Sequence, residues 1–176
     1  PFFSELWHKI RNGESLTYSW NIGMGTNFTS LFAYYLASPS NWFVALFPQK
    51  YTIEIMNAFI ILKIAGSSLS LTYYLTKHNN NKHVIAAIFG MFYGMSGFIA
   101  AYSWNIMWLD CVILIPLIML GLERLVNENR CIFYCITLGL CIFTNYYIAI
   151  MVCLSVVIYY VVLMIAYNGI KSRSEE

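Results

Sequence analysis

The sequence predicts an all-α, polytopic transmembrane bundle, preceded by an outer loop that carries interfacial helices. Hydrophobic residues make up 60% of its 176 residues, and charged residues make up only 10%. A soluble domain typically carries about 25% charged residues, because its surface faces water. A bilayer removes the need for such a surface. The composition therefore indicates a membrane protein with several spans.

The same composition gives no sign of a nucleic-acid or metal site. The net charge is only +2, there is no long basic run, and no Cys-x-x-Cys pair occurs. The cysteines lie within or beside apolar runs, so we expect small buried side chains rather than a disulfide framework. They are Cys111, Cys131, Cys135, Cys141 and Cys153. The chain opens at Pro1 without a signal peptide, so we expect it to come from a longer protein.

Three apolar segments have the length of a membrane-spanning helix, which needs about 20 residues. They cover residues 53–75, 84–102 and 109–125. Polar residues 76–83 separate the first two segments, and residues 126–130 end the third. Pro116 lies within the third segment, and membrane helices tolerate proline. We therefore predict three spans in this part of the chain.

The uncharged stretch that follows, from Cys131 to Tyr167, is too long for one ordinary crossing. The polar residues Thr144–Tyr147 are the natural place to turn. This gives two helices, over residues 131–147 and 148–167, of which the first is short. A shallow re-entrant first half is the alternative, because the sequence alone does not separate the two.

The distribution of basic residues predicts the orientation. With five crossings, one side receives Lys77, Lys82, Arg124, Arg130, Lys171 and Arg173, whereas the short loops 103–108 and 145–147 contain no Lys or Arg. The positive-inside rule then places loops 76–83 and 126–130 and the C-terminus in the cytoplasm. The tryptophans support this orientation, since all fall on the predicted outer side: Trp7, Trp20, Trp42, Trp104 and Trp108.

Residues 1–52 form the predicted outer loop. Residues 1–10 have the pattern of an amphipathic interfacial helix. Its apolar face contains Phe3, Leu6 or Trp7, and Ile10, and the residues off that face are Glu5, His8 and Lys9. Thr26 or Asn27 is a suitable cap for the next helix. Residues 28–47 are apolar but interrupted at 38–41, which predicts a bent outer helix, with a broken span as the alternative.

Asp110 is the only aspartate and falls where the third span begins. One interpretation is a helix N-cap, because Asp favours the positive end of the helix dipole. The other is a carboxylate that faces a cavity. Lys63 lies inside the first span, and Glu54 is about 13 Å away along the helix, too far for a direct pair. Lys63 therefore snorkels to the interface or faces a cavity.

Several motifs resemble those of the bacterial YfhO membrane proteins, in order and over essentially the whole chain. The most specific is Tyr102-Ser103-Trp104-Asn105-Ile106-Met107-Trp108-Leu109-Asp110. The others are Pro1-Phe2-Phe3-Ser4-Glu5-Leu6-Trp7, Tyr18-Ser19-Trp20-Asn21-x-Gly23-x-Gly25, Tyr34-Tyr35-Leu36-x-Ser38-Pro39, Gly121-Leu122-Glu123-Arg124-Leu125 and Asn145-Tyr146-Tyr147.

The resemblance implies a multi-spanning glycosyltransferase of the GT-C arrangement in the bacterial plasma membrane. Such an enzyme takes sugar from a polyprenyl-phosphate carrier on the outer face and adds it to a wall polymer such as lipoteichoic acid. Its partners would be the bilayer, the lipid-linked sugar, the polymer acceptor and other membrane proteins of the same glycosylation pathway, without nucleic acid. In this arrangement an acidic catalytic residue lies near the end of the first span, which would precede Pro1.

The chemistry of sugar transfer assigns hypothetical roles to residues of the predicted outer face. Asp110 and Glu54 are candidate general bases for the acceptor hydroxyl. Lys9, Arg11 and Lys50 are candidate partners of the leaving lipid phosphate. The candidate sugar-binding residues are Trp20, Asn21, Gly23, Gly25, Trp104, Asn105, Trp108, Asn145, Tyr146 and Tyr147. The sequence indicates no metal ligands, although a divalent cation at the phosphate stays open.

Two other functions fit the same membrane topology. A transporter or flippase of lipid-linked sugars would use the cavity without chemistry, and such proteins are often built from internal repeats. We find no repeat in this chain. A non-catalytic assembly subunit would use the aromatic loops to dock a partner.

Overall fold

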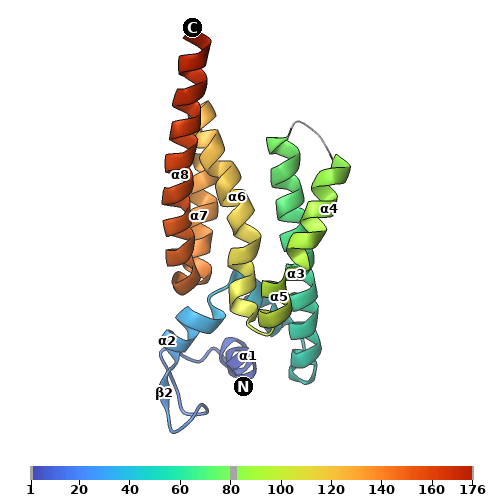
Figure 1. Cartoon of the computed structure of the whole chain (residues 1–176). Helices are drawn as coiled ribbons and strands as arrows, with labels where there is room; N and C mark the ends of the chain where they lie inside the picture. The colour runs from blue at the N-terminus through green and yellow to red at the C-terminus, as the bar shows by residue number, and fades with distance from the viewer. Residues whose placement is uncertain (1, 80–82, 176) are drawn as a thin grey trace.

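A computed structural model describes the backbone of residues 2–79 and 83–175, and the side chains in these ranges except those of Ala45 and residues 167–175. A bundle of helices stands on an N-terminal segment, with the N-terminus at one end of the molecule and the C-terminus at the other (Figure 1). Apart from one short two-stranded hairpin, the regular structure is helical. The prediction of an all-α polytopic membrane protein is confirmed.

The N-terminal segment comprises residues 2–51. Its elements are α1 (Phe2–Asn12), β1 (Tyr18–Ser19), β2 (Thr26–Asn27), α2 (Phe28–Leu31), η1 (Phe32–Leu36), η2 (Pro39–Leu46) and η3 (Gln49–Tyr51). Asn27 caps α2, because its Oδ1 accepts a hydrogen bond from the Thr29 N–H at 3.0 Å. Pro39 separates η1 from η2, since the residue before a proline is held out of the helical region. The bend predicted within residues 28–47 therefore lies before Pro39.

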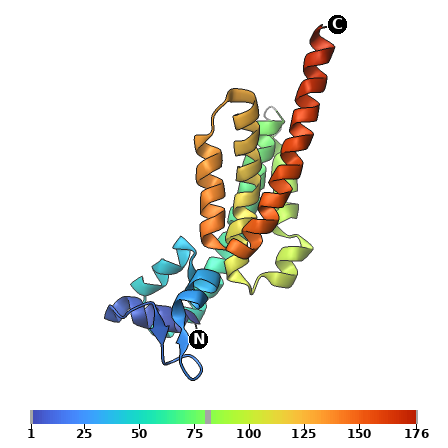
Figure 2. The ribbon, with the colours of Figure 1, turned by 90° about the vertical axis from the view of Figure 1, so that its left-hand side faces the viewer.

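The bundle contains α3 (Thr52–His78), α4 (His83–Gly94), α5 (Gly97–Tyr102), α6 (Ile106–Glu128), α7 (Ile132–Thr144) and α8 (Tyr146–Glu175). Figure 1 shows α3 running away from the N-terminal segment, α4 returning to it, and α6 running away again. Figure 2 shows α7 returning beside α6, and α8 ending far from the N-terminal segment. The C-terminal end of α8 and the α3–α4 and α6–α7 connections thus share one end of the bundle.

Four helical segments are long and apolar enough to cross a membrane, by length and composition: Gln49–His78, His83–Tyr102, Ile106–Glu128 and Tyr146–Ala166. The 13 residues of α7 extend only about 20 Å, less than the roughly 30 Å of a bilayer core. The helix α7 is thus shorter than the helix predicted over residues 131–147. It runs back towards the N-terminal segment, which is the direction that a crossing requires.

The second predicted span, residues 84–102, matches the candidate span His83–Tyr102, but its helix is interrupted. The helix ends at Gly94, and α5 begins at Gly97. Between them Ser96 has an extended backbone with ψ 152°, and its N–H turns back to the Tyr93 carbonyl at 3.2 Å. Glycine on both sides lowers the cost of leaving the helical conformation.

Small residues allow α3 and α4 to approach closely. Gly90 and Gly94 are spaced by four residues on α4 and face Ser68 and Thr72 of α3. A Cβ atom at Gly90 would lie 2.6 Å from the Ser68 carbonyl oxygen, so even alanine requires the helices to move. Glycine and serine at such spacing are typical of membrane helix pairs, where packing rather than water drives association.

Pro116 lies inside α6 and removes the backbone hydrogen bond to the Val112 carbonyl, four residues earlier. The Tyr93 hydroxyl donates to this carbonyl at 2.8 Å. A bilayer interior offers no water to satisfy such a group, so a neighbouring side chain must do so. Tyr93 therefore makes the proline tolerable and attaches α4 to α6.

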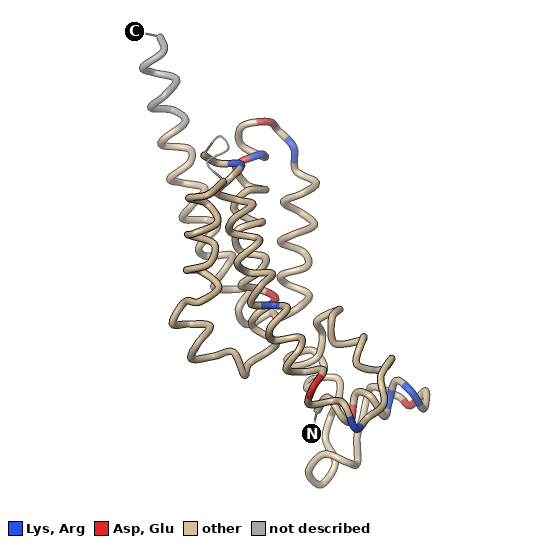
Figure 3. The backbone as a smooth tube through the Cα atoms, turned by 90° about the vertical axis from the view of Figure 1, so that its right-hand side faces the viewer, with Lys and Arg blue, Asp and Glu red and all other residues tan. Residues whose placement is uncertain are grey.

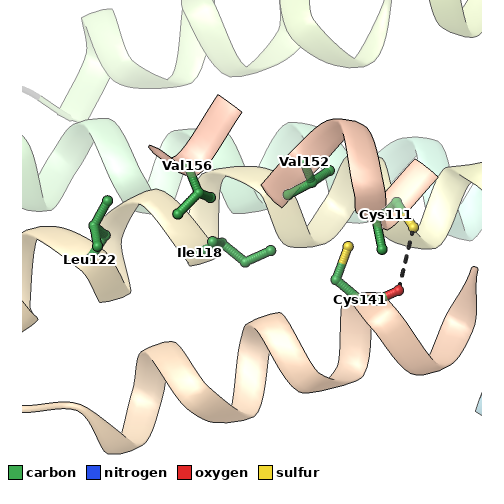
Figure 4. Close-up of a cluster of buried hydrophobic side chains, with 7 residues drawn as sticks. Cys111, Ile118, Leu122, Cys141, Val152 and Val156 are labelled. Carbon is green, nitrogen blue, oxygen red and sulfur yellow. Dashed lines mark hydrogen bonds between the residues drawn. The ribbon is translucent and has the colours of Figure 1, made fainter. Parts of the chain in front are cut away.

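Two buried clusters hold the structure together. In the bundle, α6, α7 and α8 enclose a core of Cys111, Ile118, Leu122, Cys141, Ala149, Val152 and Val156, most of which are seen in Figure 4. At its base, the N-terminal segment packs on α6 through Phe3, Leu6, Phe28, Leu36, Val44 and Ile106, with partly buried residues of α3 around them. The N-terminal segment is therefore anchored on the first turns of α3 and α6.

We use the term aromatic end for the N-terminal segment together with the α5–α6 and α7–α8 connections, and opposite end for the α3–α4 and α6–α7 connections. All five tryptophans belong to the aromatic end or to the start of α6. Charged residues gather towards the two ends, and most of the helix length between them is uncharged (Figure 3). This distribution fits a multi-pass membrane protein with an aromatic interface on one side.

Candidate functional site at the aromatic end

A buried carboxylate lies in the N-terminal segment. Glu5 is only 7% exposed, and Lys9, one turn later on α1, is 3% exposed. The Glu5 Oε1 atom accepts a hydrogen bond from the Ser19 hydroxyl at 2.5 Å, and Oε2 accepts from the Asn21 amide at 3.2 Å. The Lys9 Nζ lies 4.0 Å from Oε1. Buried charges are stable only with such partners.

The structure shows what covers Glu5 and Lys9. They were predicted to lie off the apolar face of an interfacial helix, and the hairpin that follows α1 covers them. Lys9 donates to the carbonyls of Ser15 at 2.9 Å and Tyr18 at 2.8 Å. Its ammonium group is therefore bound within the segment and is not free to meet a lipid phosphate.

The turn between β1 and β2 brings the two donors to Glu5. Gly23 and Gly25 have φ of 62° and 96°, in the left-handed region that favours glycine. At Gly25 a Cβ would also meet the end of the Tyr18 side chain, which would have to move. The predicted role of these glycines was sugar binding. Their position indicates that they shape the turn that carries Ser19 and Asn21.

Glu5 opens onto a pocket of about 340 Å³. Its walls are Ser4, Glu5, His8, Asn21, Ile22 and Gln49. The Gln49 amide donates to the Ser4 hydroxyl at 2.7 Å and so closes one side of the pocket with η3. Carboxylate, imidazole, amide and hydroxyl groups around one opening suit a ligand with several hydroxyls.

A second polar contact lies deeper, between α3 and α6. Lys63 Nζ is 2.7 Å from Asp110 Oδ2 and also donates to the Ile106 carbonyl at 3.2 Å. The N-cap interpretation of Asp110 is wrong, because α6 begins at Ile106 and its cap position is Asn105. Lys63 neither snorkels nor stands free in a cavity. The two residues are each other's counter-ions inside apolar helices, which sequence reasoning missed.

The predicted residues of the α7–α8 connection are one buried asparagine and two exposed tyrosines. Asn145 is fully buried; its Oδ1 accepts from the Ile148 N–H at 2.9 Å, and its amide donates to the Tyr34 carbonyl at 3.2 Å. The rings of Tyr146 and Tyr147 lie 5.9 Å and 6.5 Å from that of Tyr34. This connection fastens the N-terminal segment to the bundle through the buried Asn145 amide, whereas Tyr146 and Tyr147 are 53% and 44% exposed.

The tryptophans divide into exposed and packed side chains. Trp20 is 77% exposed and Trp104 is 70% exposed, so both offer open aromatic faces. Trp108 instead packs against Phe98 and Tyr102, and its indole N–H is buried without a hydrogen-bond partner. Next to Trp104, Asn105 is buried.

The other predicted charged residues stand apart from the pocket. Arg11 lies over the Trp7 ring at 5.2 Å, and the exposed Lys50 lies over the Tyr51 ring at 4.8 Å. Glu54 is exposed in the first turn of α3. Among the side chains that the structure describes, no group of three or more His, Cys, Asp or Glu could hold a metal ion.

These features define a multi-pass, all-α membrane protein whose bundle rests on a folded segment with a polar interior. The chain belongs to the family described as bacterial membrane protein YfhO, which matches residues 1–176. Comparison with the curated proteins and with the solved structures gave no match.

Proposed function

We propose that the protein is a membrane glycosyltransferase, or an essential part of one, in the bacterial plasma membrane. It would take a sugar from a polyprenyl-phosphate carrier at the aromatic end, on the outer face, and transfer it to a wall polymer such as lipoteichoic acid. The observation that carries this proposal is the oriented Glu5 carboxylate in the wall of a polar pocket at that end.

In the proposed reaction, Glu5 acts as general base. The acceptor hydroxyl oxygen attacks the anomeric carbon, and its proton passes to the Glu5 carboxylate. The bond between the anomeric carbon and the phosphate oxygen breaks, and the lipid phosphate leaves with the electron pair. Ser19 and Asn21 hold the carboxylate in place, so the base is oriented before the acceptor arrives.

The remaining roles follow from exposure and charge. Arg11 and Lys50 are the cations of this end proposed to meet the lipid phosphate, because Lys9 is bound within the segment. The exposed Trp20 adjoins Asn21 of the pocket wall and is proposed to stack on a sugar ring. Asp110 is proposed to be a positioning residue: its ion pair with Lys63 joins the middle of α3 to the first turns of α6, and the N-terminal segment packs on the same two helices.

Glu54 does not line the pocket, so we propose no step through it. The orientation remains as the basic residues predict it, with Lys77, Arg124 and Arg130 at the opposite, cytoplasmic end. The sugar and the acceptor follow only from the family resemblance.

The test is sugar transfer by the purified full-length protein in liposomes, with lipid-linked sugar supplied on the face that carries the acceptor. If the protein is the transferase, sugar transfer depends on it even when the lipid-linked sugar is already on the acceptor side. If the protein were a flippase, transfer would not depend on it under this condition. If it were an assembly subunit, the purified protein would give no transfer without its partners. Protein-dependent transfer supports the proposal, and its absence in the complete lipid system contradicts it.

A further inference from the structure

A second buried carboxylate lies at the opposite end of the bundle, far along α6 from the proposed site. Glu123 is buried, and its Oε1 accepts hydrogen bonds from the Tyr159 hydroxyl at 2.5 Å and the Tyr74 hydroxyl at 2.8 Å. The His78 Nδ1 lies 3.2 Å from Oε2. Residues of α3, α6 and α8 therefore converge on one side chain, which is fully engaged.

Directly beside this cluster is a pocket of about 380 Å³. Lys77 and His78 of α3 form one wall, and Arg124, Asn127 and Glu128 of α6 form another. Leu120 of α6 and Leu163 of α8 contribute an apolar part. Glu123 itself also lines the pocket, which thus combines basic, acidic and amide groups with aliphatic side chains.

The carboxylates of this pocket have their own partners, whereas two of its cations do not. Glu123 is engaged as described, and Glu128 Oε2 lies 3.6 Å from Arg130 Nη1. In the part of the chain that the structure describes, no carboxylate lies within 4.0 Å of Lys77 or Arg124. Their charged groups instead lie over the rings of Tyr73 and Phe133, at 6.0 Å and 5.3 Å. An anion entering the pocket would meet two cations that have no counter-ion.

The depth of the pocket identifies the source of that anion. The 23 residues of α6 extend about 34 Å, close to the roughly 30 Å of a bilayer core. Lys77 lies in the last turn of α3, and Arg124 lies near the end of α6. Both therefore reach the level of the lipid headgroups, where the phosphate of an anionic lipid attracts basic residues. The leucines lie where an acyl chain would leave the pocket.

We propose that this pocket binds the phosphate headgroup of an anionic phospholipid between Lys77 and Arg124. The lipid would be held beside the Glu123 cluster that ties α3, α6 and α8 together. The site is separate from the proposed sugar-transfer site at the aromatic end and does not depend on it.

The test uses the full-length protein in detergent, with bound lipid counted by native mass spectrometry. Phosphatidylglycerol is the anionic probe, and phosphatidylcholine of the same acyl composition is the zwitterionic control. We expect saturable retention of phosphatidylglycerol over phosphatidylcholine. K77Q/R124Q should weaken phosphatidylglycerol binding about tenfold or more, because two basic contacts are lost. Equal retention of both lipids by the wild type overturns the proposal.

Matched variants distinguish lipid binding at this pocket from binding to the overall positive charge of this end of the protein. K77R/R124K keeps both charges and should retain binding within about twofold. Arg130→Gln removes a charge at the same end that does not line the pocket; because it also frees the Glu128 carboxylate, it should weaken binding, but less than K77Q/R124Q does. If K77Q/R124Q still binds like the wild type, or if Arg130→Gln weakens binding as much as K77Q/R124Q does, the pocket is not the site. Displacement by millimolar glycerol 1-phosphate would identify a soluble phosphate as the ligand and overturn the lipid assignment.

Discussion

Lys63 Nζ lies 2.7 Å from Asp110 Oδ2 and thereby joins α3 to α6 within the apolar bundle. Both side chains are largely shielded from solvent, and the lysine has a second acceptor in the Ile106 carbonyl. A charge in such a place is expensive unless it is paired. The pair therefore sets the relative position of the two helices on which the N-terminal segment is anchored.

We expect Asp110→Asn to destabilise the full-length protein by about 3–5 kcal/mol, because it leaves the Lys63 ammonium buried without a counter-ion. The double variant K63M/D110L removes both charges and should recover most of that loss, since buried ion pairs often exchange for apolar pairs at little cost. Thermal unfolding in detergent measures both. An unstable double variant together with a stable Asp110→Asn variant would show that the pair does not hold α3 to α6.

The Tyr93 hydroxyl and Pro116 should be coupled. Tyr93→Phe leaves the Val112 carbonyl without a donor and should cost about 1–3 kcal/mol of stability. Pro116→Ala returns the backbone donor that the proline lacks, so Tyr93→Phe should cost little in that background. A double-mutant cycle on unfolding measures the coupling. Equal costs of Tyr93→Phe in both backgrounds would contradict the pairing of these two features.

Gly90 and Gly139 are both helical glycines, and they should respond oppositely to alanine. Gly90→Ala places a Cβ against Thr72 and the Ser68 backbone, so α3 and α4 must separate, at about 1–3 kcal/mol. At Gly139 of α7 nothing lies within 4 Å of the added atom, so the better helix propensity of alanine should leave stability unchanged or slightly raised. The measurement is thermal unfolding of each variant, and similar shifts would argue against the close packing of α3 on α4.

Much of the bundle follows from the sequence because its signals are local. Runs of apolar residues predict the spans, and the polar residues between them predict the connections. The break after Gly94 was not predicted, because hydropathy continues through Met95 and only the backbone changes direction. The sequence predicted a short helix here, but α7 is shorter than expected. It begins only after Asn129, whose left-handed backbone ends α6.

The site was harder to predict because it depends on contacts between distant segments. Lys63 and Asp110 are ionisable residues within predicted spans, so a pairing hypothesis was available from the sequence. Glu5 gave no such signal. Its burial depends on Ser19 and Asn21, which reach it through a turn formed by glycines with positive φ. Helical periodicity placed Glu5 on the polar face and gave no information on what covers that face.

The most direct measurement of the proposed function is sugar transfer by the full-length Glu5→Gln variant, with lipid-linked sugar supplied on the acceptor side. The amide keeps the shape of the side chain but cannot take the acceptor proton, so we predict a loss of about 100-fold or more in transfer rate. Glu14→Gln is the matched control, because Glu14 belongs to the same segment but does not line the pocket. Folded Glu5→Gln protein that transfers sugar as fast as the control would contradict the assignment of Glu5 as the base.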